Sequence, residues 1–247
     1  GLAFSNDGTK MFVVGNENDK VYEYTIAILH CLDNPQFVDA FSVASQSVNP
    51  YDIKFNTDGT KMFVVGDNAG TSDINEYTLS TAFDVSTASF VDALDVFSQE
   101  KDPRGVAFNS AGTKMFVSGR NDNKSSLVNE YTLSTGFDVS TASHVDGFSV
   151  EDQDDRPHGL AFSNDGTKMF VVGNENDKVY EYTLSTAFDV STASFVDAFS
   201  VASEEIIPIG IAFNSAGTKM FVSGESGDDV NVYKLSTGFD VSTAVAQ

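Results

Sequence analysis

Apolar and polar positions alternate along this chain in short runs that are separated by turn-forming residues. Residues 159–162 form an apolar run, residues 163–166 read Ser-Asn-Asp-Gly, and residues 168–172 form a second run rich in Phe and Val. Residues 179–183, Val-Tyr-Glu-Tyr-Thr, alternate with a period of two, and residues 195–201 form a fourth run. Short alternating runs bounded by turns predict β-strands. Because no window shows an apolar stripe with the 3.6-residue period, we expect no helices.

This four-run unit recurs along the whole chain. The hexapeptide Gly-Thr-Lys-Met-Phe-Val begins at Gly8, Gly59, Gly112, Gly166 and Gly217, at steps of 51, 53, 54 and 51 residues. A fixed period of this size is the signature of a repeat architecture, and four antiparallel strands per unit is the plan of a β-propeller blade. An immunoglobulin-like sandwich, the main rival, has about 100 residues and needs no near-identical units. We therefore predict an all-β protein, a five-bladed β-propeller of four-stranded antiparallel blades.

The repeats divide a single domain into residues 1–51, 52–104, 105–158, 159–209 and 210–247. The last repeat stops where the outer strand of the other repeats follows, so we expect the fifth blade to lack its outer strand. Val230–Leu235 would then be an open edge of a monomer, available for pairing with another strand. Lys234 is a usual guard of such an edge, whereas Val232, which replaces a Glu, favours a partner strand.

The repeat resembles the YVTN and NHL-type propeller repeats. Residues 157–162, Pro-His-Gly-Leu-Ala-Phe, and 208–213, Pro-Ile-Gly-Ile-Ala-Phe, carry the resemblance together with the recurring hexapeptide. Residues 184–194, Leu-Ser-Thr-Ala-Phe-Asp-Val-Ser-Thr-Ala-Ser, resemble uncharacterised repeats of marine bacteria and phages. Both resemblances imply that the Gly-Leu-Ala-Phe strand is innermost and the Phe-Val-Asp-Ala-Phe strand outermost.

The aromatic residues follow the repeat. All but Phe97 of the 21 Phe fall on the strands and long loop of the units, and all but Tyr51 of the eight Tyr fall on the third strand. We interpret them as packing residues between blades and not as a platform for stacking bases or sugars.

Charge and length limit the classes of partner that the protein can bind. The chain has 247 residues, enough for one large core, and 36 acidic against 14 basic residues give a net charge of −22. Such a surface repels nucleic acid and anionic membranes, so we expect neither as a partner. The single Cys excludes a disulfide framework, and no apolar run approaches the ~18 residues of a membrane span. The acidity and the resemblance to phage repeats favour an extracellular location or the surface of a cell or phage.

Differences among the repeats point to one face. The turn between the first and second strands is almost fixed, whereas the loops between the second and third strands and the loops between blades vary. In a four-stranded antiparallel blade, these two variable loop sets emerge on the same face. Because loops on a rigid scaffold usually carry binding specificity, we predict that this face binds the ligand. Simple tolerance of change is the alternative.

The candidate binding residues come from these variable loops. Each residue after an interblade Pro lies nearest the mouth of the central channel, and the four form a mixed ring suited to a small polar ligand: Tyr51, Arg104, His158 and Ile209. The other candidates are charged residues of the same loops: Asp19, Asp67, Asp73, Arg120, Asp122, Asp177 and Asp228. Solvated loop positions are the alternative interpretation.

Acidic turns and loops raise the question of calcium. The Asp-Gly turn is interpreted as a hairpin turn, because Ala111 and Ala216 replace its Asp in two copies. Asp152, Asp154 and Asp155 could hold a structural calcium ion, but we expect solvated surface carboxylates. No other cofactor is expected.

His30 and Cys31 are the only residues that suggest a nucleophile and a base. They lie in residues 26–36, which share no identity with residues 184–194 although both flanks match. His30 stands where Phe188 stands, so we interpret the block as a packing fault. Because no Ser-His-Asp arrangement, zinc spacing or phosphate loop occurs, no catalytic residue is assigned.

These patterns predict a non-enzymatic propeller that binds carbohydrate or protein through its variable-loop face. Near-identical blades offer little of the asymmetry that a catalytic centre needs. The first alternative is a hydrolase or lactonase with its site at the channel mouth, because enzymes of that class also use propellers of similar repeats. The second is a fragment of a larger structural repeat protein.

Overall fold

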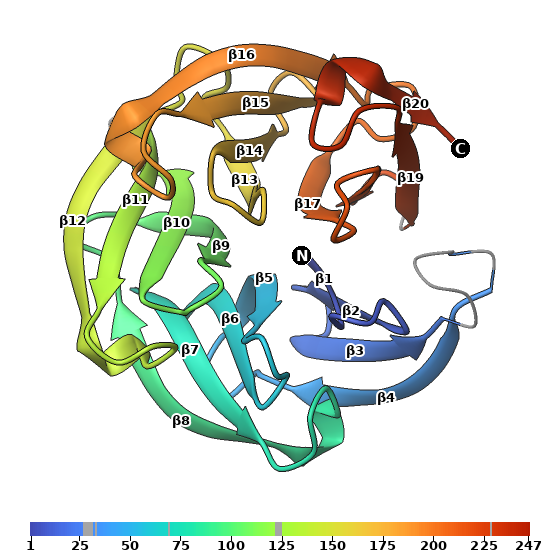
Figure 1. Cartoon of the computed structure of the whole chain (residues 1–247). Helices are drawn as coiled ribbons and strands as arrows, with labels where there is room; N and C mark the ends of the chain where they lie inside the picture. Colours follow the sequence, from blue (N-terminus) through green and yellow to red (C-terminus); the bar gives the residue numbers. More distant parts are fainter. Residues whose placement is uncertain (27–31, 33, 69, 122–124, 228) are drawn as a thin grey trace.

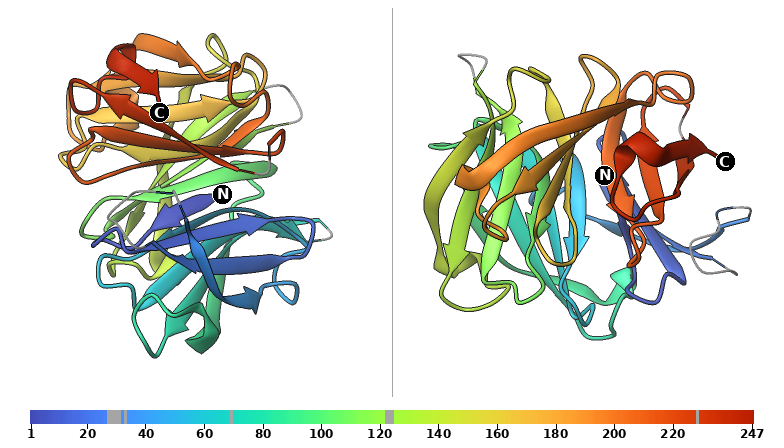
Figure 2. Two further views of the ribbon diagram at one scale, coloured as in Figure 1. Left: turned by 90° about the vertical axis from the view of Figure 1, so that its right-hand side faces the viewer. Right: turned by 45° about the horizontal axis from the view of Figure 1, so that its top comes forward.

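The protein is a ring of five β-sheets. The computed structural model describes residues 1–26, 32, 34–68, 70–121, 125–227 and 229–247. Within these residues, twenty strands form five sheets of four antiparallel strands, arranged around a common centre (Figure 1). The predicted five-bladed β-propeller is therefore confirmed, and Figure 2 shows the same ring from two further directions.

Each blade takes four consecutive strands in chain order, from the centre outwards. Blade 1 contains β1 (Leu2–Phe4), β2 (Lys10–Gly15), β3 (Lys20–Thr25) and β4 (Gln36–Ser42). Blade 2 contains β5 (Asn49–Phe55), β6 (Lys61–Asn68), β7 (Thr71–Leu79) and β8 (Ala88–Asp95), and blade 3 contains β9 (Asp102–Phe108), β10 (Lys114–Arg120), β11 (Ser126–Leu133) and β12 (Ala142–Ser149). Blade 4 contains β13 (Pro157–Phe162), β14 (Lys168–Gly173), β15 (Lys178–Leu184) and β16 (Ala193–Ser200), and blade 5 contains β17 (Pro208–Phe213), β18 (Lys219–Gly224), β19 (Val230–Leu235) and β20 (Ala244–Ala246).

Helical structure in the described chain is limited to single 3-10 turns. They precede the outer strands of blades 2 to 5: η1 (Val85–Thr87), η2 (Val139–Thr141), η3 (Val190–Thr192) and η4 (Val241–Thr243). The Asp before each turn caps it, as Asp189 does by accepting from the Ser191 N–H. No described helix has the length and apolar character that crossing a membrane requires.

The Asp-Gly turn is a hairpin turn, as the sequence predicts. Asp165 accepts the N–H of Thr167 at 3.0 Å and the hydroxyl of Ser163 at 2.7 Å, and these hydrogen bonds lower the pKa of its carboxyl. Gly166 has φ of 70° and lies against the ring of Phe188. A side chain at this position would meet both the backbone strain and the ring, which explains the glycine.

An ion pair in the second and third strands joins each of the first four blades to the next. In blade 4, Lys168 Nζ lies 2.6 Å from Glu181 Oε1 and donates to the carbonyl of Phe239 in blade 5 at 2.6 Å. The other oxygen of Glu181 accepts the N–H of Val241 at 2.9 Å. We call this arrangement the interblade latch; the other three latches are built on Lys10 and Glu23, Lys61 and Glu76, and Lys114 and Glu130.

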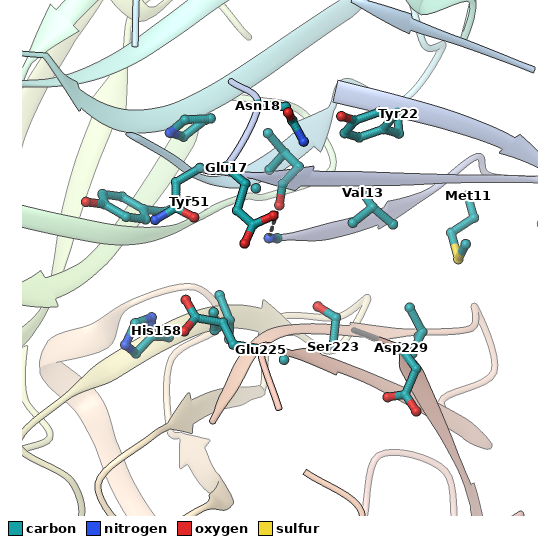
Figure 3. A pocket seen from close by; sticks show the side chains of 18 of the residues that line it. Met11, Val13, Glu17, Asn18, Tyr22, Tyr51, His158, Ser223, Glu225 and Asp229 are labelled. Atoms are coloured by element: carbon teal, nitrogen blue, oxygen red, sulfur yellow. Dashed lines mark hydrogen bonds between the residues drawn. The ribbon is translucent and has the colours of Figure 1, made fainter. Parts of the chain in front are cut away.

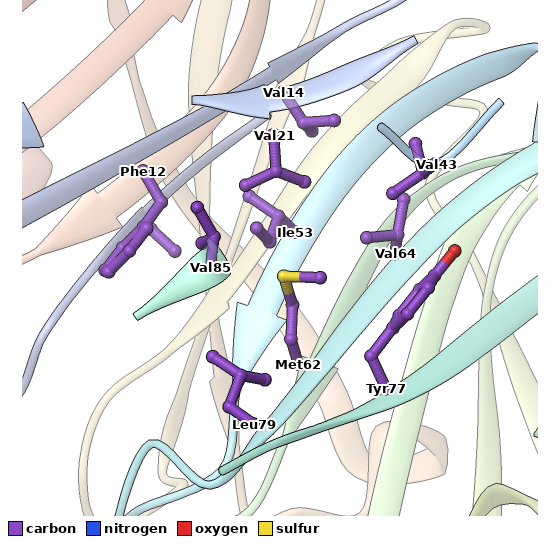
Figure 4. Close-up of a cluster of buried hydrophobic side chains, with 11 residues drawn as sticks. Phe12, Val14, Val21, Val43, Ile53, Met62, Val64, Tyr77, Leu79 and Val85 are labelled. Atoms are coloured by element: carbon purple, nitrogen blue, oxygen red, sulfur yellow. The ribbon is translucent and has the colours of Figure 1, made fainter. Parts of the chain in front are cut away.

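Aromatic residues fill the same four joints. Phe170 of blade 4 packs against Phe213 and Phe239 of blade 5, with ring centroids 4.5 and 6.1 Å away. Figure 4 shows the corresponding cluster between blades 1 and 2, in which Val43, Val64 and Tyr77 lie together. The interpretation of the aromatics as interblade packing residues therefore holds for these joints.

The ring closes between blade 5 and blade 1 through a different joint. Leu2, Met11, Ile26 and Phe221 form its core cluster, and Phe4 packs on Phe221 with centroids 4.6 Å apart. Val232 stands at the position of the latch glutamate. We call this contact the closing joint. The predicted packing fault at His30 and Cys31 lies outside the described residues.

One detail of the predicted fold is wrong, because blade 5 does have an outer strand. β20 pairs with Tyr233, Lys234 and Leu235 of β19, although it has only three residues where β16 has eight. The capped turn η4 repeats the turn of the other blades and delivers the chain to the outer position. Ala244 pairs with Leu235 just as Ala193 pairs with Leu184 in blade 4. The outer strand therefore begins after the turn even where the Phe-Val sequence of the other outer strands is absent.

Candidate binding site

A cavity of about 860 Å³ opens where the variable loops meet. Its lining includes the loops between second and third strands of blades 1 and 5, the residues that follow the interblade prolines, and strand residues such as Met11 and Tyr24. A smaller cavity of about 440 Å³ is lined instead by the fixed turns, including Asn6, Thr57 and Asn164. The variable and fixed loops therefore border different cavities, in line with the two faces that the repeat pattern predicts.

The four residues that follow the interblade prolines line the large cavity together. Tyr51, Arg104, His158 and Ile209 lie on the innermost strands β5, β9, β13 and β17. Their convergence follows from the ring, because each innermost strand begins at the same end of the channel. The cavity therefore has a mixed mouth, built from three polar side chains and one apolar side chain.

Tyr51 and Arg104 form a fixed pair in this mouth. The guanidinium carbon of Arg104 lies 3.9 Å from the Tyr51 ring centroid, a cation–π contact. Arg104 Nη2 is 2.7 Å from Asp102 Oδ1, and the Tyr51 hydroxyl donates to Asp67 Oδ2 at 3.2 Å. Burial raises the pKa of Tyr51 to about 12, so its hydroxyl is a neutral donor at pH 7.

His158 supplies a buried imidazole. Its residue is 8% exposed, and its Nδ1 has no hydrogen-bond partner among the described residues. Burial, with a smaller contribution from Arg104, lowers the pKa of His158 to about 3, so the ring is neutral at pH 7. Buried polar atoms are nearly always hydrogen-bonded, so this nitrogen is a candidate contact for a ligand.

The opposite wall of the cavity is acidic and partly apolar. Glu17 comes from blade 1, and Glu225 and Asp229 come from blade 5 (Figure 3). Sequence reasoning missed Glu17 and Glu225, which line the same cavity only because the ring brings blades 1 and 5 together. Their position in the variable loops is the sequence signal that could have identified them as site residues. Beyond them, the cavity continues to Met11, Tyr22 and Tyr24 of the closing joint.

Among the residues that the structure describes, the other predicted site residues do not line this cavity. Asp67 is connected to the cavity only through its hydrogen bond with the Tyr51 hydroxyl. Arg120 Nη2 lies 3.9 Å from Asp155 Oδ2. Asp19 and Asp177 occupy loop turns with φ of 50° and 51°. Asp73 pairs across the sheet with Asp95, and burial raises the pKa of its carboxyl. Asp122 and Asp228 lie outside the described residues.

Asp154 is not the solvated carboxylate that the sequence suggested. It is 2% exposed and accepts the N–H groups of Arg156 at 2.8 Å and Asn176 at 3.2 Å. Glu100 and Glu205 are buried at the same loop position in blades 2 and 4. These carboxylates brace the variable loops from inside. Within the described residues, no three His, Cys, Asp or Glu side chains are grouped so that they could hold a metal ion.

Comparison with known proteins defines the class. No protein-family model and no curated protein sequence matches the chain. A protein from Lactobacillus plantarum matches with a TM-score of 0.57 at 14% identity, covering 100% of this chain and 68% of that one. The periplasmic gluconolactonase of Pseudomonas aeruginosa matches with 0.54 at 16% identity (99% and 68% covered), and a chain of a nidogen–laminin complex with 0.58 at 11% (94% and 74%).

These similarities concern the fold. At 11–16% identity they show that the chain shares its architecture with β-propeller proteins. The chain is therefore a β-propeller protein, and its assignment to a particular repeat type stays a prediction.

Proposed function

We propose that this propeller is a binding protein that recognises a carbohydrate or protein ligand through its variable-loop face, at the large cavity. The observation that carries the proposal is the convergence of Tyr51, Arg104, His158 and Ile209. These positions differ from blade to blade, whereas the turn between the first and second strands is almost fixed. Variation concentrated in one cavity of a rigid scaffold is typical of a recognition site.

The chemistry of the cavity favours a ligand rich in hydroxyl groups. Arg104 offers N–H donors, Glu17 and Glu225 offer carboxylate acceptors, and neutral His158 offers one unpartnered ring nitrogen. Hydroxyl groups both donate and accept, so they match such a mixed lining. An extracellular or particle-surface location, where such ligands are displayed, is part of the proposal.

A glycan library and a panel of cell-surface proteins, presented to the intact chain, would test the proposal. Arg104→Ala should weaken binding of any ligand found by at least about tenfold, because it removes a charged donor worth about 1.5–3 kcal/mol. Ile209→Tyr should do the same by filling the cavity. Arg120→Ala, an arginine outside the cavity, is the matched control and should bind as the original chain does. Equal binding by all four proteins would refute the assignment of the site.

The second candidate is a lactone hydrolase acting in the same cavity. It is favoured by the names of three structural neighbours, two putative 6-phosphogluconolactonases and a periplasmic gluconolactonase, and by the position of the cavity at the channel mouth. Hydrolysis of glucono-δ-lactone, followed as acid release, would test it. Turnover that His158→Gln or Arg104→Ala abolishes would establish the hydrolase and displace the binding proposal.

A further inference from the structure

We propose that the smaller cavity is a second binding site, which takes one neutral sugar at the opposite end of the central channel from the large cavity. The innermost strands β1, β5, β9, β13 and β17 surround this channel (Figure 1). They begin at the large cavity and end at the smaller one, as Tyr51 and Phe55 of β5 show. This inference goes beyond the proposed function, because it concerns the fixed turns and not the variable loops.

The wall of the smaller cavity is apolar and repeats five times. Each innermost strand ends in a Phe that lines the cavity and is only partly buried: Phe4, Phe55, Phe108, Phe162 and Phe213. The Phe of each second strand is, by contrast, 0% exposed. The five rings at the strand ends therefore pack between blades and also border the cavity. A volume of about 440 Å³ with such a wall is within the size range of small-molecule sites.

One blade interrupts this repeat with two charged residues. Blades 1, 3, 4 and 5 have Gly and Ala at the first and third positions of the Gly-x-Ala-Phe sequence, whereas blade 2 has Asp52 and Lys54. Lys54 lines the smaller cavity. Because four blades fold with Gly and Ala at these positions, the blade does not require the charged pair. A buried ion pair is also weak evidence for stability, so a role in binding accounts for the pair better than a role in folding.

Asp52 holds the ammonium group of Lys54 in place. Lys54 Nζ lies 3.0 Å from Asp52 Oδ2 and donates to the carbonyl of Leu2 at 3.3 Å. Asp52 is 1% exposed, and its Oδ2 also accepts the N–H of Val106 at 3.1 Å. An ammonium group has three N–H donors, of which Asp52 and Leu2 can occupy two. Lys54, whose side chain is 19% exposed, therefore has a donor left for a ligand in the cavity.

Polar side chains of the fixed turns form the rim of the cavity. Asn6 donates an amide N–H to the carbonyl of Thr57, and Thr57 Oγ1 donates to the carbonyl of Ser110 at 2.9 Å. Asn164 Nδ2 donates to the carbonyl of Ser215 at 2.7 Å. These bonds tie neighbouring turns together, so the rim is ordered before a ligand arrives and the entropic cost of binding is lower. Because the two Asn side chains use only their N–H groups in these bonds, their amide oxygens can accept from a ligand.

The charges around the cavity select a neutral ligand. Asp7, Asp58 and Asp165 each follow a residue of the rim, and hydrogen bonds within the turns lower the pKa of each carboxyl, so all three are ionised at pH 7. Together with the net charge of −22, these carboxylates disfavour an anion. The ammonium group of Lys54 disfavours a cation inside the cavity.

A sugar matches both the wall and the rim. The C–H groups of its ring form apolar faces that the Phe wall can cover, and its hydroxyl groups both donate and accept. Lys54 would donate to a hydroxyl oxygen, and the amide oxygens of Asn6 and Asn164 would accept from hydroxyl groups. Because all five blades enclose one cavity and Lys54 occurs once, one sugar would bind per chain.

Titration of the intact chain with sugars, followed by the NMR shifts of its amides, would test the proposal. The panel contains glucose, galactose and mannose, each as the free sugar, the methyl glycoside, the uronic acid and the amino sugar. The methyl glycoside represents the end residue of a glycan, so its binding relative to the free sugar distinguishes the two sources of this chemistry. At least one neutral sugar should bind below about 10 mM, one per chain, and shift the amides of Ala107, Phe108 and Ala161. Its anionic and cationic analogues should each bind at least about tenfold more weakly.

Protein variants locate the binding. Asp52→Gly and Lys54→Ala, made together, give blade 2 the residues of the other four blades, so the fold should be retained while the ammonium donor is lost. This double variant should bind the sugar at least about tenfold more weakly, and Ala161→Phe, which fills the cavity, should do the same. Lys20→Met, at an exposed lysine, is the matched control and should bind as the original chain does. Circular dichroism would confirm that each variant is folded.

The position of the shifted amides separates this proposal from the proposed function. A sugar that shifts the amides of Tyr51 and His158 instead, and that the double variant binds unchanged, would support the large cavity and overturn this inference. Shifts confined to the smaller cavity would support this inference whatever the large cavity binds. The inference is also overturned if no neutral sugar of the panel binds at about 10 mM, if more than one binds per chain, or if the charged analogues bind equally well.

Discussion

Residues 1–25 and 159–183 have the same sequence but sit in different joints of the ring. The blade 4 copy is covered by an outer strand of blade 3, and its Tyr182 is fully buried. The blade 1 copy faces blade 5, and its Tyr24 lines a cavity. The comparison shows that the burial of a blade depends on its neighbour, as expected for repeat units that cannot bury their own apolar face.

The joints also differ in their polar contacts. Four joints are fastened by a Lys–Glu pair, of a buried glutamate and a partly buried lysine, that binds the backbone of the next blade, whereas Val232 occupies the glutamate position at the closing joint. A buried ion pair is sensitive to loss of one partner, because the other charge stays buried without compensation. We infer that the standard joints are rigid and that the closing joint opens first.

The largest effect is expected from breaking a standard joint. Glu130→Ala should lower the free energy of unfolding by about 3–5 kcal/mol, because Lys114 loses its partner and the Val190 N–H loses its acceptor. Urea denaturation would measure the change. Glu151→Ala, at an exposed glutamate, is the control and should change stability by less than about 0.5 kcal/mol. A loss below about 1 kcal/mol for Glu130→Ala would mean that the latch contributes little.

The converse experiment installs a latch at the closing joint. Replacing residues 26–36 with the sequence of residues 184–194 should raise the melting temperature, because it supplies an aromatic side chain whose loss from a core costs a few kcal/mol. Val232→Glu alone should destabilise, since it places a carboxylate against the apolar cluster of the closing joint. The chain that carries both changes should be more stable than their separate effects predict. Calorimetric melting of the original chain, the two single variants and the combined variant measures this coupling. A lower melting temperature after the block replacement would show that residues 26–36 are adapted to this joint.

A smaller effect concerns the loops that connect blades. Burial raises the pKa of Glu100 to about 8, from 4.5. A raised folded-state pKa means that its contribution is fully present below pH 4.5 and is lost as pH rises through about 8. Glu100→Gln should therefore flatten this decline and stabilise the fold by about 1–3 kcal/mol at pH 8.5.

Denaturation at several pH values would measure how the free energy of unfolding of Glu100→Gln depends on pH. The same measurement on Glu205→Gln is the matched comparison. Glu205 holds the same loop position and accepts the N–H groups of Ile207 and Ser226. If Glu100→Gln left the pH dependence of stability unchanged, the raised pKa of Glu100 would be contradicted.

The smallest effect is expected on the outer rim. His144 replaces the Phe of the other outer strands and packs edge-on against Tyr131, with centroids 5.3 Å apart. Because the site is exposed, His144→Phe should stabilise blade 3 by less than about 1 kcal/mol. Thermal melting measures the shift, and a clear loss of stability would show that the 3.3 Å contact of Nε2 with Asn129 Oδ1 matters more than aromatic packing.

The repeat period, the turn glycines and the alternating strands were sufficient to predict the five-bladed ring. They also predicted that Tyr51, Arg104 and His158 converge, because equivalent positions of successive blades face one channel. The short strand β20 was missed because its residues lack the Phe-Val pattern and only the capped turn before them directs the chain. Asp154 was misjudged since its carboxylate is buried against the N–H of Asn176, 22 residues along the chain.

The contrast between the two identical segments is tested most directly by hydrogen exchange of their amides, resolved by NMR because the sequences are the same. Identical sequences have the same intrinsic exchange rates, so any difference reports local opening. The amides of β2 and β3 in blade 1 should exchange at least about tenfold faster than those of β14 and β15. Equal protection of the two segments in the free protein would contradict the conclusion that the closing joint is the weak and open contact of the ring.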